Sequence, residues 1–239
     1  MSALFEALGD AETPSGTIRL WRRRDLALNL DVYEVKLGDE YLMTSVFPDT
    51  EIALATVGLG EIADGENLDV VVGGLGLGYT AKAVLQDDRV HSLVVVEFVG
   101  AVIEWHEAHL VPASSAIVQD GRARLVHGDF FAMAQSPEGL DPEHPGRTFD
   151  AILVDIDHTP EYRLDDDHGS FYTERGLRQT AAHLRAGGIF GFWSDGLPID
   201  TFTALLGEVF DDVEARVVTF DNPVTRGQSS ATIYVGRRR

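Results

Sequence analysis

Four apolar segments in the middle of the chain end in glycine or in an acidic residue. The first, Val70–Val72, runs into a cluster of glycines, Gly73, Gly74, Gly76 and Gly78. The acidic residues that end the other three segments are Glu97, Asp129, Asp155 and Asp157. Because the carboxyl ends of parallel strands meet at one edge of a sheet, we expect these residues to surround a single site.

The glycine cluster and Glu97 together indicate a nucleoside-binding unit. A β-branched run, a glycine-rich turn and a helix-compatible segment, Tyr79–Leu85, follow one another, which is the order of a nucleotide-binding βα unit. Glycine has no Cβ, so a ligand can approach the backbone closely there. Glu97 lies 19 residues after Gly78, where Rossmann-like sites place the acid that binds ribose hydroxyls.

The later acidic residues separate two kinds of nucleoside ligand. A dinucleotide brings a pyrophosphate to the first helix N-terminus, whereas S-adenosylmethionine has no phosphate and carries a positive sulfonium. An acidic rim therefore favours S-adenosylmethionine. An NAD-dependent dehydrogenase is a weaker alternative, because it leaves Asp129, Asp155 and Asp157 unexplained.

The sequence resembles the class I S-adenosylmethionine-dependent methyltransferases, and within them the spermidine synthase-like branch. The resemblance spans about Leu68 to Gly188 and rests on VVVGGLGLG, VVVEF, HGDFF, FDAILVDIDHTP and SFYTERGLRQTAAHLRAGGIF. It implies an α/β fold with a Rossmann-like, mostly parallel seven-stranded sheet, an antiparallel C-terminal hairpin and a small N-terminal β unit.

The resemblance also implies roles for individual residues. Glu97 is expected on the ribose, Asp129 near the adenine amino group, and Asp155 at the site of group transfer. The implied cofactor-binding set is Gly73, Gly74, Gly76, Gly78, Glu97, Phe98, Asp129, Phe130 and Asp155. The predicted catalytic residues are Asp155, Asp157 and His158; a carboxylate would orient or deprotonate the acceptor, and His158 is a candidate general base.

Three departures from the spermidine synthase pattern affect the predicted reaction. The upstream segment Tyr41–Glu51 lacks the Asp-Glu-X-X-Tyr-His-Glu pattern that shapes the polyamine site in those enzymes. Gly76 stands where those enzymes have an aspartate in the glycine loop, and their catalytic Asp-Ser-Ser-Asp-Pro is replaced by Asp155-Ile-Asp-His-Thr-Pro160. We therefore predict a methyltransferase that uses S-adenosylmethionine and a small-molecule acceptor. The alternatives are a polyamine aminopropyltransferase using decarboxylated S-adenosylmethionine, and a non-catalytic nucleoside-binding module.

The segments outside this core are predicted from local patterns. Residues 1–47 form the small β unit and 48–239 the cofactor-binding domain, with Met1–Gly16 a short helix or loose arm and Arg237–Arg239 a disordered tail. Glu51 is expected on a helix surface, with a place near the donor's amino group as the alternative. His106 and His109 are expected at a surface or interface, and Trp193 in the core, with an acceptor platform as its alternative. His158–Gly169 is expected to select the acceptor.

Composition limits the remaining possibilities. The chain has 239 residues, 44% of them hydrophobic, and a formal charge of −20, which disfavours nucleic acid and anionic membranes as partners, although solubility alone also explains the acidity. Without cysteine, disulfides and thiolate metal sites are excluded. We predict no metal site, although the acids and histidines of residues 155–168 leave a divalent cation as a minor hypothesis. A cytoplasmic protein and a possible homodimer are expected.

Overall fold

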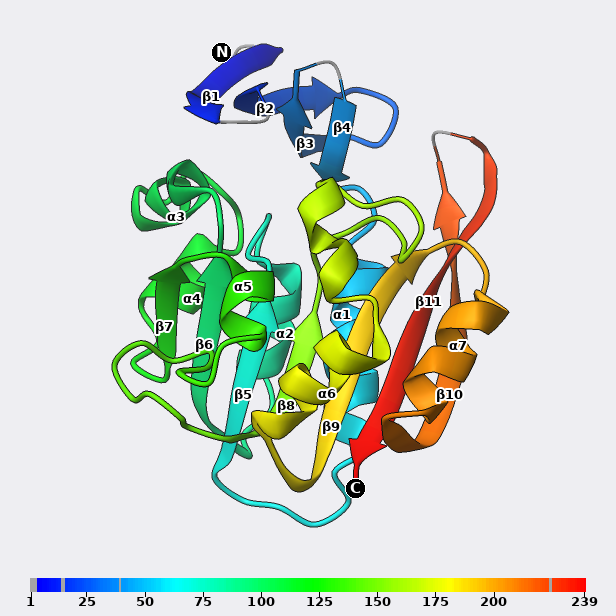
Figure 1. Ribbon diagram of the computed structural model, residues 1–239. Helices are drawn as coiled ribbons and strands as arrows, with labels where there is room; N and C mark the ends of the chain where they lie inside the picture. Colours follow the sequence, from blue (N-terminus) through cyan, green and yellow to red (C-terminus); the bar gives the residue numbers. More distant parts are fainter. Residues whose placement is uncertain (1–3, 14–15, 39, 224) are drawn as a thin grey trace.

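The computed structural model describes residues 4–13, 16–38, 40–223 and 225–239, which contain two β-sheets (Figure 1). The larger sheet has seven strands in the order β10-β11-β9-β8-β5-β6-β7. Its strands are β5 (Leu68–Gly73), β6 (Val90–Glu97), β7 (Ala123–His127), β8 (Phe149–Val154), β9 (Leu184–Asp195), β10 (Phe210–Asn222) and β11 (Gly227–Arg238). Strands β5 to β9 run parallel, while β11 is antiparallel to β9 and β10. The predicted fold class is confirmed.

Helices cover both faces of the large sheet, which explains the uninterrupted apolar strands. Successive side chains of a strand point to opposite faces, so Val70 and Val72 join one core cluster while Val71 joins the other. The first cluster includes residues of α1 (Asp49–Gly60), α2 (Tyr79–Leu85), α3 (Gly100–Glu107) and α4 (Ser114–Val118). The second includes residues of α5 (Phe130–Ala134), α6 (Glu174–Ala182) and α7 (Asp200–Gly207).

The smaller sheet is a four-stranded antiparallel meander at the N-terminus. Its strands are β1 (Phe5–Thr13), β2 (Gly16–Asp25), β3 (Leu30–Leu37) and β4 (Glu40–Thr44). The predicted helix or loose arm over Met1–Gly16 is therefore wrong for its described residues. Gly9 and Asp10 weaken the strand pattern of β1. The strand nevertheless forms because it pairs along its length with β2, with a register irregularity between Ala7 and Gly9.

The N-terminal sheet lies over the edge at which the parallel strands end (Figure 1). Ile18 and Leu20 of β2 belong to the same core cluster as the helices α1 to α3. Strand β1 also touches α3, since a Cβ at Gly9 would meet the indole of Trp105. The small sheet is thus placed to close the functional edge of the large one. The division into units 1–47 and 48–239 stays a prediction.

The C-terminal arginines are part of the structure. Arg237 belongs to β11 and donates to the carbonyl oxygens of Gly187 at 3.0 Å and Glu61 at 2.9 Å. Arg239 follows with an ion pair to Asp211 at 2.7 Å. The prediction of a disordered tail is wrong, because Arg237 and Arg239 bind carbonyl and carboxylate groups of other segments. These segments lie far away in the sequence.

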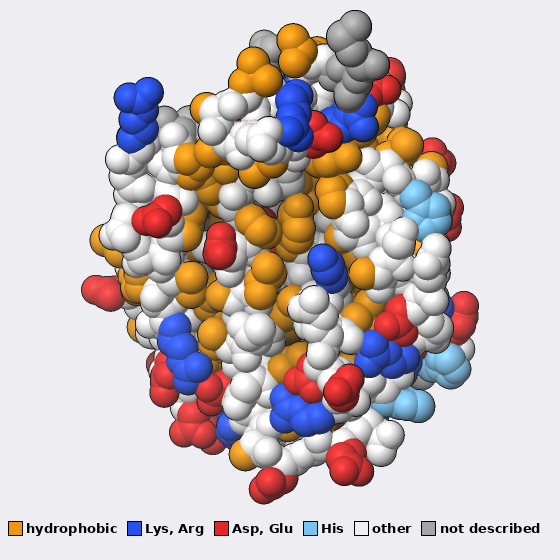
Figure 2. All heavy atoms as spheres, turned by 180° about the vertical axis from the view of Figure 1, so that it is seen from behind, with side chains coloured by type: hydrophobic (Ala, Val, Ile, Leu, Met, Phe, Trp, Pro, Cys, Tyr) orange, Lys and Arg blue, Asp and Glu red, His pale blue; other side chains and the backbone are white. Residues whose placement is uncertain are grey.

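The side of the large sheet that carries α1 exposes apolar side chains, which gather near the middle of the face seen in Figure 2. Ile52 of α1 and Val217 of β10 are 37% and 46% exposed.

In the described part of the chain, no helix is both long enough and apolar enough to cross a membrane.

Candidate functional site

Two adjoining cavities lie at the carboxyl edge of the parallel strands, beneath the N-terminal sheet. We call one the glycine-loop cavity; it measures about 290 Å³ and is lined by residues including Gly74, Glu97 and Asp129. The other, the aromatic cavity, measures about 390 Å³. Residues that line both cavities are Leu42, Met43, Gly76, Asp155, Ile156 and Leu164. Cavities therefore lie where the strand ends predicted a site, and Asp155 lines both of them.

Backbone packing at the end of β5 requires glycine. Gly74 has φ +92°, and a Cβ there would collide with the carbonyl oxygen of Asp155. Gly76 has φ +49°, and a Cβ would lie 2.8 Å from Sδ of Met43. Gly74 and Gly76 line the glycine-loop cavity and Gly78 lines the aromatic cavity, whereas Gly73 lines neither and packs against Phe130.

Glu97 is buried at the end of β6 and holds the glycine loop. Its two carboxylate oxygens accept hydrogen bonds from the backbone N–H groups of Leu75 at 2.9 Å and Val99 at 2.7 Å. Burial raises the pKa of Glu97, while the backbone donors oppose that rise. A carboxylate offers about four lone-pair positions, so Glu97 can still accept from ligand hydroxyls in the cavity that it lines.

Asp129 and the aromatic residues Phe98 and Phe130 also line the glycine-loop cavity. The Asp129 carboxylate caps α5, accepting from the backbone N–H of Ala132 at 3.1 Å. Phe98 is 57% exposed at the cavity, whereas Phe130 is buried. The structure thus gathers the predicted acid and ring residues around one nucleoside-sized space.

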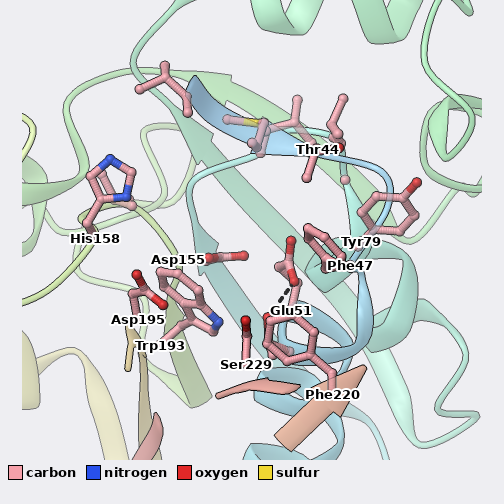
Figure 3. A pocket seen from close by; sticks show the side chains of 18 of the residues that line it. Thr44, Phe47, Glu51, Tyr79, Asp155, His158, Trp193, Asp195, Phe220 and Ser229 are labelled. Atoms are coloured by element: carbon pink, nitrogen blue, oxygen red, sulfur yellow. Dashed lines mark hydrogen bonds between the residues drawn. The ribbon is translucent and has the colours of Figure 1, made fainter. Parts of the chain in front are cut away.

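Asp155 and Glu51 form a pair of carboxyl groups in the aromatic cavity. Figure 3 shows the two groups pointing toward each other. The Thr80 hydroxyl connects their segments: it donates to Asp155 at 2.6 Å and lies 3.2 Å from the Glu51 carbonyl oxygen. Glu51 also accepts from the Thr50 hydroxyl at 2.7 Å. Glu51 was expected to be a surface acid, but the N-terminal sheet and its link to α1 enclose the helix end that carries it.

Both carboxyl groups hold protons more strongly than usual. Burial, together with the negative charge of Asp155, raises the pKa of Glu51 to about 7. Burial raises the pKa of Asp155 to about 6, in spite of the hydrogen bond from Thr80. Among the described residues, neither carboxyl group has a positively charged partner. A bound cation would therefore lower both pKa values and be bound more tightly in return.

Aromatic rings form much of the remaining wall of this cavity. Phe47 and Phe220 pack at 5.4 Å between ring centroids, and Tyr79 and Trp193 complete the set (Figure 3). Trp193 packs against the first core cluster, as expected, and also lines the cavity. No local pattern predicts this grouping, since Phe47 precedes α1 and Phe220 lies in β10.

The other two predicted catalytic residues differ in their placement. His158 lines the aromatic cavity and stacks on Tyr162, with 5.3 Å between ring centroids. Asp157 is buried and lines neither cavity. It accepts from the Tyr172 hydroxyl at 2.7 Å and the Leu164 N–H at 2.8 Å, so it anchors the loop that follows β8.

That loop covers the glycine-loop cavity more than the aromatic one. Asp165, Asp167 and His168 line the former only, and Leu164 lines both. The loop thus contributes to both cavities, with His158 in the aromatic one, and the expectation that it selects the acceptor stays a prediction. In the described residues, no group of three or more histidine and acidic side chains is arranged to hold a metal ion.

His106 supports the glycine loop from behind. It is fully buried, and its Nε2–H donates to the carbonyl oxygen of Gly76 at 2.9 Å. Burial lowers the pKa of His106, which keeps the ring neutral. The expected surface position is wrong for His106, because α3 turns this side chain toward the loop that it stabilises.

The described residues that line the two cavities include seven carboxylates and no lysine or arginine. The acidic residues are Glu51, Glu97, Asp129, Asp155, Asp165, Asp167 and Asp195. Apart from the two histidines, every charged side chain that a ligand filling both cavities would meet in the described lining is therefore acidic. Such a lining favours a cationic ligand and opposes one that carries a carboxylate or phosphate.

Comparison with known proteins identifies the fold. No protein-family model matches the sequence. The crystal structure of spermidine synthase from Thermotoga maritima is similar over 98% of this chain and 73% of that chain, with a TM-score of 0.70 and 19% identity. A spermidine synthase in complex with the transition-state analogue AdoDATO matches over 98% and 74%, with a TM-score of 0.69 and 20% identity. The chain thus has the spermidine synthase-like form of the S-adenosylmethionine-dependent methyltransferase fold.

Proposed function

We propose that this protein transfers an aminopropyl group from decarboxylated S-adenosylmethionine to an amine acceptor. The observation that carries the proposal is the charge of the two cavities, which combine seven carboxylates with no lysine or arginine in the described lining. Intact S-adenosylmethionine has a carboxylate that needs a positive or N–H partner. Its decarboxylated form has two positive charges and no negative one, so the lining favours it.

The glycine-loop cavity is the proposed seat of the nucleoside. Glu97 would accept from the ribose hydroxyls and Asp129 from the adenine amino group, with Phe98 and Phe130 against the base. The sulfonium and the propylamine tail would then pass Gly76 toward Asp155, the residue shared by the two cavities. A solved structure of similar fold holds AdoDATO, a transition-state analogue, which supports an adenosyl ligand.

The aromatic cavity is the proposed seat of the acceptor. An ammonium group is attracted both by carboxylates and by the faces of aromatic rings, and this cavity offers Glu51 and Asp155 among four rings. The raised pKa values of the two carboxyl groups show that their charges are poorly compensated by the protein itself. A cationic amine supplies the compensation.

The chemistry requires removal of one proton from the acceptor. An alkylammonium is not a nucleophile, so Asp155 or Glu51, with a pKa of about 6 or 7, takes its proton as general base. The freed nitrogen lone pair attacks the propyl carbon attached to sulfur. A nitrogen–carbon bond forms, the carbon–sulfur bond breaks with its electron pair moving to sulfur, and methylthioadenosine leaves. The protein aligns the two substrates in line.

A product assay with mass spectrometry tests this proposal. The protein is incubated with each donor and a panel of monoamines and diamines, and the nucleoside product is identified. Methylthioadenosine together with an acceptor heavier by one aminopropyl group is the expected result with the decarboxylated donor. Failure of every amine under conditions in which the donor binds would favour the non-catalytic nucleoside-binding module.

Methyl transfer from intact S-adenosylmethionine is the second candidate, because of one observation. Gly76 has no side chain where the spermidine synthase pattern has an aspartate, and Met43 occupies the space that a side chain would need. The donor amino group therefore lacks one expected carboxylate. Formation of S-adenosylhomocysteine and a methylated acceptor in the same assay would establish this candidate and overturn aminopropyl transfer.

A further inference from the structure

His168 lines the glycine-loop cavity but has no role in the transfer reaction described above. It belongs to the 3₁₀ helix η1 (Asp166–Ser170), and its side chain is 18% exposed. Its Nδ1 lies 2.9 Å and 3.1 Å from the two carboxylate oxygens of Asp157. A histidine fixed in this way by a buried carboxylate presents its other ring nitrogen in a defined orientation.

The surroundings of Asp157 determine which nitrogen of His168 carries the proton. Asp157 accepts from the Leu164 N–H at 2.8 Å and from the Tyr172 hydroxyl at 2.7 Å. Burial raises the pKa of Tyr172 well above its usual value, so this phenol keeps its proton and donates. Asp157 therefore acts as an acceptor, and Nδ1 of His168 must be the third donor. In the neutral ring, Nε2 is then left with a lone pair that accepts hydrogen bonds.

The ring of His168 contacts the helix that Asp129 caps. It packs against Phe131, with 4.1 Å between ring centroids. Phe131 lies in the first turn of α5, the helix that Asp129 caps. Both His168 and Asp129 line the same cavity. Among the described residues, Nε2 of His168 has no hydrogen-bond partner.

From the fixed ring and the cavity that it shares with Asp129, we infer that His168 determines specificity for adenine. Its Nε2 accepts one hydrogen of the adenine 6-amino group, while the Asp129 carboxylate accepts the other. A base with a 6-oxo group would place its oxygen against two acceptors and would be rejected. This inference rests on the proposed adenosyl donor and adds the group that identifies its base. Asp165 and Asp167 line the same cavity but are exposed, and Asp165 already accepts from the Asp167 N–H at 2.9 Å.

The test compares calorimetric affinities for methylthioadenosine and its 6-oxo analogue, methylthioinosine. The wild-type protein should prefer methylthioadenosine by about tenfold or more, the effect of one buried unpaired polar group. His168→Phe should reduce this preference at least threefold, whereas His168→Gln, which retains an acceptor, should preserve most of it. His91→Phe, at an exposed histidine that lines neither cavity, should leave it unchanged.

A change at Asp157 gives an independent readout. In Asp157→Asn the amide can donate to Nδ1 of His168, which moves the ring proton to Nε2 and turns that atom into a donor. The preference should then shift toward methylthioinosine, an effect that loss of loop structure alone would not produce. Thermal melting of each variant verifies folding.

The outcomes separate this inference from the proposed function. An unchanged base preference in folded His168→Phe would overturn the role of His168 while leaving the adenosyl donor in place. Failure of the wild-type protein to bind either nucleoside would overturn the donor assignment and this inference with it. A purely structural role predicts equal weakening of both nucleosides in the variants, which would also contradict the inference.

Discussion

Acidic residues at the two edges of the large sheet differ in whether arginines pair with them. At the amino edge, Asp69 at the start of β5 pairs with Arg147 at 2.7 Å and Arg185 at 2.6 Å. Asp141 similarly meets Arg147 at 3.0 Å and also contacts Arg124. At the carboxyl edge, the acidic residues that line the two cavities have no lysine or arginine beside them in the described lining.

This difference distinguishes structural acids from acids kept for a ligand. Burial alone would raise the pKa of Asp141, yet Arg124, Arg147 and His144 hold that pKa well below its usual range. Burial likewise raises the pKa values of Glu51 and Asp155, and no cationic side chain of the described residues lowers them again. The protein thus stabilises one set of charges itself and leaves the other to be neutralised by a cationic substrate.

The largest expected effect is on turnover in Asp155→Asn. Loss of a general base at the junction of the two cavities should reduce kcat by about 10²- to 10⁴-fold. Methylthioadenosine, which needs no proton transfer, should still bind. Asp150→Asn, at an ion-paired acid on the amino edge, is the comparison variant and should retain kcat. A kcat within a few fold of wild type in Asp155→Asn would remove Asp155 as the base and leave Glu51 as the one to test.

At the amino edge the corresponding substitution should affect stability instead. Asp141→Asn leaves two arginines without their buried carboxylate, which should lower the free energy of unfolding by about 3–5 kcal/mol in urea titrations. Glu143→Gln is the matched control. Glu143 pairs with Arg124 at 3.0 Å but is 66% exposed, so its substitution should lower the free energy of unfolding by less than about 1 kcal/mol. Equal effects of the two substitutions would contradict the distinction between buried and exposed pairs.

The same carboxyl group makes part of the stability depend on acid pH. A folded-state pKa below the unfolded value means that the unfolded chain binds more protons at low pH. The contribution of Asp141 is therefore present above pH ~4 and is lost as the pH falls below it. The difference in unfolding free energy between wild type and Asp141→Asn should shrink from pH 6 to pH 3.

Ribose recognition by Glu97 gives an intermediate effect. Replacing it with glutamine removes a charged acceptor, so the affinity for methylthioadenosine should fall about 10- to 100-fold in calorimetry. Glu104→Gln, at an exposed position of α3, provides the control and should leave the affinity unchanged. An unaltered affinity in Glu97→Gln would show that the ribose lies elsewhere.

A smaller effect is expected from pH on binding of the cationic donor. The raised pKa values mean that Glu51 and Asp155 become charged only as the pH passes about 6 to 7. Affinity for the decarboxylated donor should therefore rise several-fold between pH 5.5 and pH 8, and Glu51→Gln should flatten that rise. A fall in affinity over this range would contradict the assigned direction.

The sequence predicted the glycine-loop cavity well because its residues mark the ends of consecutive strands. Gly74, Glu97, Asp129 and Asp155 each follow an apolar run, and a parallel sheet brings such positions together by its topology. The predicted sheet and its C-terminal hairpin are confirmed for the same reason. Local patterns were sufficient to predict the site wherever a strand pairs with the next strand in the chain, or with the strand that the recognised fold places beside it.

The aromatic cavity could not be predicted in this way. Phe47, in the segment between β4 and α1, meets Phe220 of β10, and no local spacing reports a contact between segments so far apart in the chain. For the same reason Glu51 was interpreted as a surface acid and β1 as a helix or arm. Asp157 shows the opposite error: a strand-end acid fitted the catalytic pattern, but its position is taken up by hydrogen bonds that hold the loop.

The central claim is that the unpaired carboxylates at the carboxyl edge select a donor without a carboxylate. Calorimetric titration of the wild-type protein and Glu51→Gln with decarboxylated and intact S-adenosylmethionine tests it most directly. We predict that the wild-type protein binds the decarboxylated donor at least tenfold more tightly and that Glu51→Gln reduces this ratio. Tighter binding of intact S-adenosylmethionine by the wild-type protein would contradict the claim.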